Sequence, residues 1–366
     1  MKILGFSKFI SILILATLVC SNACLSEERT KSYSELLKEA VSEAGMYVSG
    51  YELLSQIPGP GRWSPVAPPE YIRFVEGLDT KDAIPFLLDV IENGPDWQAD
   101  EYEGRDNELA PHIARCYAVL CLASTKDAQA YPVLTDLLKS GTFLAAPDMH
   151  EETRQKYDIK KYAAAGLGIL ADDRAVSLLV SALDNSNPQV RYQSMFALAK
   201  INDTRAIEPI LNAAVKYELD DFSLDSCMKK LTKIKFTTKF HKKKREIEFT
   251  AFPELGTVKF NEHPYKKVWQ HWFRNGRKWT RQRFEKNYNS YVKGKHKGRS
   301  RKEIENLGVA ALPLIIDKIK LGQTGLMPLV SELTDNEVKK SADADDVLRW
   351  WKANKQKWLI PFPASN

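Results

Sequence analysis

Apolar and polar positions alternate along most of the chain in the manner of amphipathic helices. Tyr162 to Gly168 is a run of small apolar residues, Ala175 to Leu183 is a leucine-rich run, and a short polar turn separates the two. Apolar residues three and four positions apart lie on one face of a helix and pack against a core. The pattern therefore predicts an all-α protein made of short, paired helices.

The helix pair is a repeated unit. Four residues of one pair recur 31 positions later in the next pair: Leu167, Asp172, Arg174 and Ala175 become Leu198, Asp203, Arg205 and Ala206. The tetrad at residues 80–83 likewise recurs letter for letter at residues 125–128. Because one helix pair cannot bury its own apolar face, such units are stable only when they stack into a continuous core.

The turns between the helices carry polar residues with predictable roles. The Asp of each unit stands where its carboxylate can cap the helix that follows. Asn187 and Pro188 suit the N-cap and the first position of a further helix. Arg174 and Arg205 recur at the same turn, and we expect each to pair with the Asp of an adjacent unit.

These repeats resemble a known family. The stretch from Lys161 to Ala214 is similar to the HEAT-like repeat first described in phycobilisome lyases, and Tyr71–Asn93 and Ala110–Gly141 resemble degenerate copies with inserted loops. The resemblance implies a HEAT-type helical-repeat solenoid of armadillo-type fold. It implies neither pigment chemistry nor any other activity, because such arrays serve as scaffolds, adaptors and a few enzymes.

The N-terminus has the features of an export signal. Lys2 and Lys8 precede an apolar run at residues 9–19, and small residues lead from there to Cys24. This run of about 11 residues is short of the roughly 20 that span a bilayer, and suits a signal peptide. We expect loss of residues 1–23 and a location in the periplasm or cell envelope. Two outcomes stay open: lipidation of Cys24, as in bacterial lipoproteins, or plain cleavage and secretion.

A second internal repeat contains tryptophans. Trp272, Asn275 and Trp279 recur at an offset of 79 as Trp351, Asn354 and Trp358. On a helix each set lies on one stripe, which is either an aromatic platform for a sugar or peptide or a structural anchor in the core. A full apolar stripe favours the anchor, with each Asn bonded to a neighbouring backbone. The motif resembles a Trp-rich tail of exported bacterial HEAT-repeat proteins, which implies no particular chemistry.

Charge divides the chain. Residues 229–301 hold 23 Lys or Arg and 5 Asp or Glu, whereas the remainder holds 30 and 42. Two clusters are candidates for binding anions: Lys242, Lys243, Lys244 and Arg245, and Lys293, Lys295, Lys297, Arg299 and Arg301. They either bind an anionic polymer or lipid surface, or only balance the acidic part of the chain. Export argues against nucleic acid as the ligand.

No motif for catalysis or metal binding stands out. The chain has no zinc-type Cys pattern, no Gly-rich phosphate loop and no nucleophile elbow. The acidic insert at residues 95–109 lacks the glycine and spacing of a calcium-binding EF-hand, which favours a solvated loop. Cys116 and Cys121 would lie about 140° apart around one helix, a poor geometry for a disulfide. We therefore expect no cofactor.

Together these patterns divide the chain into five parts. They are the signal at 1–23, an N-terminal helix and Pro/Gly-rich linker at 24–69, the HEAT-like array at 70–217, a basic region with the first Trp motif at 218–301, and a helical region with the second at 302–366. Residues 246–260 alternate and turn, which predicts a short β-hairpin or an extended arm.

The function that we expect is that of a non-catalytic, extracytoplasmic scaffold that binds a protein partner through the array. The alternative is a binder of an anionic envelope polymer or lipid surface through residues 229–301. An enzyme whose site is assembled from distant residues would escape a motif search. The sequence gives no indication of the oligomeric state.

Overall fold

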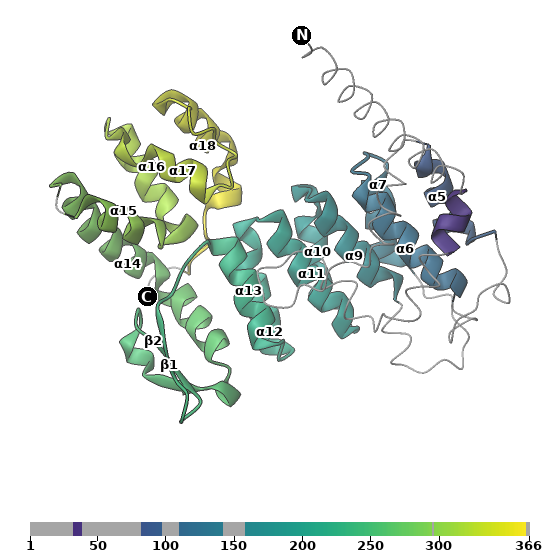
Figure 1. Ribbon diagram of the computed structural model, residues 1–366, viewed down its shortest axis with the longest axis horizontal. Helices are drawn as coiled ribbons and strands as arrows, with labels where there is room; N and C mark the ends of the chain where they lie inside the picture. Colours follow the sequence, from purple (N-terminus) through teal and green to yellow (C-terminus); the bar gives the residue numbers. More distant parts are fainter. Residues whose placement is uncertain (1–31, 39–81, 97–109, 142–157, 295, 364–366) are drawn as a thin grey trace, which may run out of the picture. The chain divides into compact units, whose positions relative to one another are not determined.

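The computed structural model describes residues 32–38, 82–96, 110–141, 158–294 and 296–363, which are mostly helical (Figure 1). The chain forms two compact units, Met1–Ser49 with Ala67–Thr125, and Gly50–Val66 with Lys126–Asn366. The array expected at residues 70–217 is thus shared between the units. The signal segment with Cys24, most of the acidic insert and Lys295 lie outside the described residues.

The described part of the first unit contains a helix at residues 33–38, α5 (Ala83–Asn93) and α6 (Ala110–Ser124). One face of α5 is buried at helical spacing, including Leu87 and Val90. Nearly all of α6 is buried, and neither Cys116 nor Cys121 on this helix is in a disulfide. The two cysteines therefore behave as small buried apolar residues.

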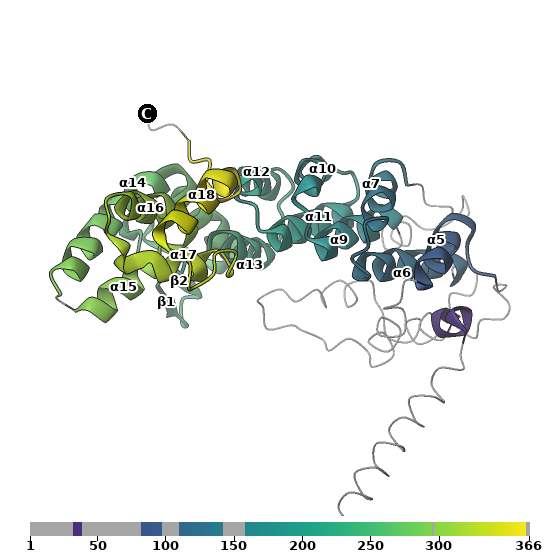
Figure 2. The same ribbon diagram turned by 90° about the horizontal axis from the view of Figure 1, so that it is seen from above.

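The second unit begins with stacked helices in two rows. Figure 2 shows α7 (Ala130–Ser140), α10 (Val176–Ala182) and α12 (Ile207–Lys216) in one row, and α9 (Ile159–Leu170), α11 (Pro188–Ile201) and α13 (Asp221–Thr232) in the other. Short 3₁₀ turns, Asp173–Ala175 (η4) and Thr204–Ala206 (η5), lead into α10 and α12. The helix pairs expected from the 31-residue recurrence are therefore present.

Small residues set the distance between α9 and α11. A Cβ atom added to Gly168 would lie 2.8 Å from the Cα atom of Ala197, closer than real Cβ contacts. The two helices thus approach each other backbone to backbone, as the alanine- and glycine-rich pattern predicts. Close packing of this kind leaves no room for a larger side chain.

The caps follow the sequence with one correction. Asn187 accepts a hydrogen bond from the backbone N–H of Gln189, with Pro188 in the first turn, as expected. Asp172 and Asp203 each cap a 3₁₀ turn. The prediction that Arg174 and Arg205 reach the Asp of an adjacent unit is wrong: each binds the Asp two residues before it, at 2.5 Å. The guanidinium folds back because the 3₁₀ turn places both groups on one side.

The C-terminal part of this unit contains a small sheet. Strands β1 (Thr238–His241), β2 (Glu246–Phe249) and β3 (Thr257–Lys259) are antiparallel in the order β1-β2-β3. The alternating segment at residues 246–260 forms the predicted hairpin, β2 with β3, and β1 adds a third strand that lies before this segment. Thr238–His241 is fully exposed and mostly polar, so it carries no alternating pattern that would predict a strand.

The remaining helices follow the sheet in sequence, and the first of them is the longest. They are α14 (Pro264–Val292), α15 (Lys297–Glu305), α16 (Leu312–Lys320), α17 (Met327–Leu333) and α18 (Ala344–Trp358). Beyond α18 the chain returns to the repeats: the Thr204 hydroxyl in η5 lies 2.8 and 2.9 Å from the carbonyl oxygens of Lys357 and Leu359. Phe362 then packs against Trp272 of α14, with ring centroids 5.1 Å apart. In the described part of the chain, no helix has both the length and the apolar character needed to cross a bilayer.

Candidate interaction surfaces

The first Trp motif is embedded in α14. Trp272 is fully buried between Trp269 and Phe362, whereas Trp279 is half-buried against Phe252. Asn275 is exposed and donates to the backbone oxygen of His271, one turn earlier, at 3.0 Å. The stripe thus faces the interior, and Asn275 lies at its solvent-exposed edge. Trp272 therefore forms no flat aromatic platform on the surface.

The second Trp motif in α18 repeats this arrangement. Trp351 is 8% exposed and Trp358 is fully buried. Asn354 donates to the backbone oxygen of Trp350, also one turn earlier, at 2.9 Å. The indole N–H of Trp358 donates to Glu337 at 3.2 Å.

Trp269 is also buried, but the match between the two Trp motifs did not point to it. The second motif has no tryptophan at the corresponding position. Its indole N–H donates to the buried carboxylate of Asp225 at 2.9 Å, and Lys229 binds the same carboxylate at 2.6 Å. Asp221, one turn earlier on α13, accepts the backbone N–H groups of Tyr265 and Lys266. Burial raises the pKa of Asp221, although these two N–H groups favour its charged form. Two acidic residues of α13 therefore fix the start of α14.

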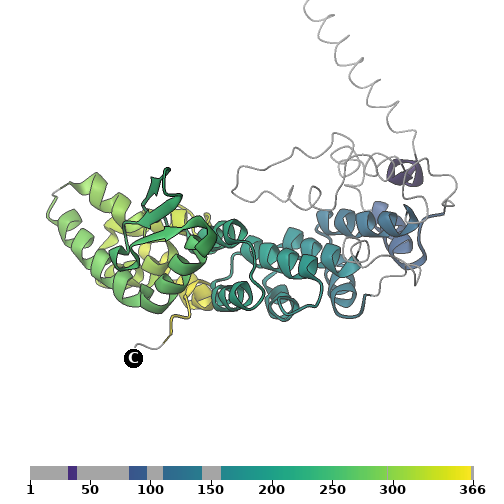
Figure 3. The ribbon, with the colours of Figure 1, turned by 90° about the horizontal axis from the view of Figure 1, so that it is seen from below.

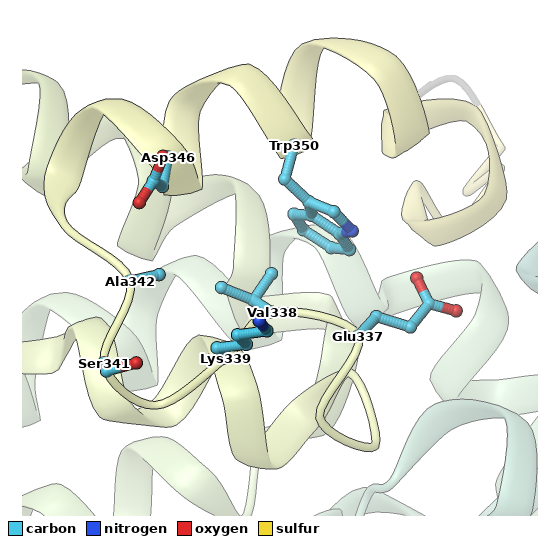
Figure 4. A pocket seen from close by; sticks show the side chains of 7 residues that line it. All are labelled: Glu337, Val338, Lys339, Ser341, Ala342, Asp346 and Trp350. Atoms are coloured by element: carbon cyan, nitrogen blue, oxygen red, sulfur yellow. The ribbon is translucent and has the colours of Figure 1, made fainter.

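A shallow hollow of about 240 Å³ lies beside α18 (Figure 4). Trp350 and Val338 form its apolar wall, and Glu337 and Asp346 are its carboxylates. Both carboxylates are engaged, Glu337 by Lys357 at 2.6 Å and Asp346 by Arg349 at 2.5 Å. The hollow therefore offers no isolated pair of carboxylates for acid–base chemistry.

The two basic clusters lie at opposite ends of α14 and do not form one surface. Lys242–Arg245 forms the turn between β1 and β2, beside Phe260 and the first residues of α14. Lys293 follows the last residue of α14, and Lys297, Arg299 and Arg301 lie in α15. A helix of 29 residues is about 43 Å long at 1.5 Å per residue. One compact anion could not bridge the two clusters.

The clusters also differ in their pairing. Arg301 binds Glu332 at 2.9 Å, and the Lys297 ammonium lies 5.2 Å from the ring centroid of Tyr291. The four residues of the β1–β2 turn are exposed, and none forms an ion pair with the described residues. The turn is therefore the more available of the two cation clusters.

Beside this turn lies a group of three aromatic side chains, two exposed and one half-buried, that no sequence pattern brings together. Phe222, Phe240 and Phe260 come from α13, β1 and the 3₁₀ turn Phe260–Glu262 (η7), and we call them the aromatic rim. Phe240 pairs with Ile247 across the sheet, so it continues the apolar face of the sheet outward. Only tertiary folding brings these three residues together.

Comparison with known proteins adds one similarity. A family model described as HEAT repeats matches residues 151–220, the stretch that contains α9 to α12. No curated protein matches the chain. Among the described residues, no cluster of three or more His, Cys, Asp or Glu is placed to hold a metal ion. HEAT repeats generally mediate contacts between proteins, and this chain is mostly helical with HEAT-like repeats at its centre.

Proposed function

We propose that the protein is an exported, non-catalytic scaffold that holds a protein partner along the row formed by α7, α10 and α12. This proposal rests on the positions of the solvent-exposed side chains in the two rows. No residue of α9 or α11 is exposed, whereas each helix of the other row presents exposed residues. A partner of the repeats therefore has most to contact along α7, α10 and α12.

The chemistry of this row suits a protein surface. Its exposed residues are small, polar or of mixed charge, among them Asp136, Lys139, Ser177, Ser181, Glu208 and Asn212. Val215 adds an exposed apolar side chain, at 48%. A surface of mixed charge with few apolar residues favours a specific polar interface over a polyanion or a bilayer.

Bonds between successive repeats make this row a stable platform. Asn187, the cap of α11, donates to Asp158, the cap of α9, at 2.9 Å. Lys216 and Tyr217 both bind Asp184 of the preceding repeat at 3.0 Å. A surface that is ordered before binding loses less conformational entropy when a partner docks.

Export supports an envelope location for this scaffold. The basic start, the apolar run and the small residues before Cys24 are the features that motivate it. In this proposal the mature chain is either anchored through a lipid on Cys24 or released as a secreted protein. Either form would present the repeats outside the cytoplasm.

The test is capture from a cell-envelope fraction at low and at high salt. The wild-type chain should retain one protein at high salt, and Ser181→Arg with Asn212→Arg should lose it, since both side chains are exposed on the row. Gln282→Arg with Gln356→Arg, exposed positions on α14 and α18, is the matched control. Equal capture by the row variant and the wild type would rule out this row, and capture that disappears at high salt would favour an electrostatic ligand instead.

A further inference from the structure

Aromatic side chains, two of them largely exposed, gather at one place in the second unit. Phe222 is 57% exposed and Phe240 is 52% exposed. The half-buried Phe260 links the two, with ring centroids 6.4 Å from Phe222 and 5.2 Å from Phe240. Tyr265 extends the group, 5.5 Å from Phe222. Large apolar residues scattered singly over a surface are ordinary, but a contiguous exposed group usually marks a contact site.

Unpaired cations border this aromatic rim. The backbone N–H of Phe260 donates to the carbonyl of Arg245 at 3.1 Å, which holds the basic turn Lys242–Arg245 against the rim. Lys259, the residue before Phe260, is also exposed, and neither it nor the turn forms an ion pair with the described residues.

The carboxylates closest to the rim compensate little of this charge. Glu248 already binds Lys239 and His241, and Glu262 binds Lys267. Glu246 lies opposite Lys259 in the strand register, and Lys259 also contributes to lowering the pKa of Glu262 after its main partner Lys267, so these two carboxylates offset Lys259 but not the four cations of the turn. The rim and its turn therefore present aromatic rings surrounded by a net positive charge.

We propose that the aromatic rim and the Lys242–Arg245 turn dock on an anionic lipid surface. Apolar rings enter the boundary between headgroups and acyl chains, while lysine and arginine bind the lipid phosphates, and the combination binds anionic bilayers more firmly than either part alone. The hairpin that carries the turn projects from the surrounding helices, as an inserting tip must (Figures 1 and 3).

The alternatives to a lipid fit less well. A soluble anionic polymer would use the cations but would leave Phe222 and Phe240 in water. The cores of protein–protein interfaces are also depleted of lysine, whereas three lysines stand beside these rings. This site is separate from the α7, α10 and α12 row, so it does not rest on the proposed scaffold function.

The experiment is co-sedimentation of the full chain with vesicles of phosphatidylcholine alone and of phosphatidylcholine mixed with phosphatidylglycerol. Phe222→Ser with Phe240→Ser should weaken binding to the anionic vesicles about tenfold or more, because the inserting rings are gone. Replacement of Lys242, Lys243, Lys244 and Arg245 by Ser should weaken it about a hundredfold or more, since each cation is attracted to the anionic surface. Residues 1–31 are the same in every variant, so their contribution to binding does not change.

Two matched controls use the same unit. Val292→Ser with Leu321→Ser removes exposed apolar side chains elsewhere, at 62% and 72% exposure. Lys293→Ser, Lys297→Ser and Arg299→Ser together remove cations at the far end of α14. Neither control should change vesicle binding, and circular dichroism should show all variants folded.

Three results would overturn the proposal. One is a Phe222→Ser, Phe240→Ser variant that binds anionic vesicles as the wild type does. Another is a far-end control that loses as much binding as the turn variant, which would indicate a general charge effect. The third is equal binding of the wild type to neutral and anionic vesicles. If the phenylalanine variant fails to fold, the turn variant and the far-end control still test the site. Loss of vesicle binding in the turn variant alone supports the proposal, and equal vesicle binding by the turn variant and the far-end control opposes it.

Discussion

Removal of the Trp272 side chain tests whether the first Trp motif is a structural anchor. The ring is fully buried, with centroids 5.5 Å from Trp269 and 5.1 Å from Phe362. Deletion of a buried large aromatic side chain costs about 3–5 kcal/mol of unfolding free energy. An aromatic residue buries about 150–250 Å², which at about 25 cal/mol per Å² corresponds to about 4–6 kcal/mol as an upper bound. The two estimates agree, so we expect Trp272→Ala to destabilise the second unit by about 3–5 kcal/mol.

A companion variant separates packing from hydrogen bonding at this site. The indole nitrogen of Trp272 is buried without a hydrogen-bond partner among the described residues. Trp272→Phe removes this unsatisfied N–H group and keeps a ring in the cavity, so its cost should fall below about 3 kcal/mol. A larger loss for Phe than for Ala would contradict this account.

The matched control is Trp350→Ala, because Trp350 is half-exposed at the open hollow beside α18. Its truncation should cost about 1 kcal/mol, as expected for a partly exposed side chain. Thermal unfolding followed by far-UV circular dichroism shifts by about 2–4 °C per kcal/mol in a unit of this size. Trp272→Ala should therefore lower Tm by about 6–20 °C and Trp350→Ala by about 4 °C at most. Equal shifts, or an unchanged Tm for Trp272→Ala, would refute the anchor role.

Three other outcomes can be tested, two that follow from the structure and one from the sequence. Gly308→Ala should lower Tm sharply, because Gly308 has φ +62 and an added Cβ would collide with the backbone oxygen of Thr232; a normal melt would show that the contact is loose. Lys200→Met should raise Tm at pH 7, because burial, followed by two nearby lysines, lowers the pKa of Lys200, and its positive charge therefore opposes folding. This gain in Tm over the wild type should shrink as the pH rises into the range where lysine in the unfolded chain also loses its proton. Mass spectrometry of protein from the producing cells should show loss of residues 1–23, with a diacylglycerol group on Cys24 in the lipoprotein case; an intact Met1 in mature material would contradict export.

The sequence predicted the repeats well because their signals are local. The recurring Asp at each turn, the Asn187–Pro188 start of α11 and the glycine that faces Ala197 all act within one helix pair or between neighbouring pairs. The error on Arg174 and Arg205 arose because a 3₁₀ turn, not visible in an apolar pattern, places each arginine beside its own Asp.

The C-terminal part was harder to predict because its contacts join distant residues. Phe222 and Phe240 come from different elements, and only the fold of the sheet against α13 and α14 makes them one surface. The sequence could not place the two basic clusters relative to each other, and in the fold a single long helix separates them. A charge count reports how many cations a segment has and not where they point.

The bond between Thr204 and the carbonyl of Lys357 has a consequence for the order of folding. These residues are 153 positions apart, so η5 gains this partner only after the ribosome has added all of α14 to α18. The earlier helix pairs need only neighbours in sequence and can form as soon as they emerge. Until residues 357–362 have been synthesised, η5 lacks its hydrogen-bond partner and the ring of Trp272 lacks its contact with Phe362. The core around η5 and Trp272 is therefore completed late, by contacts that the repeats cannot make among themselves.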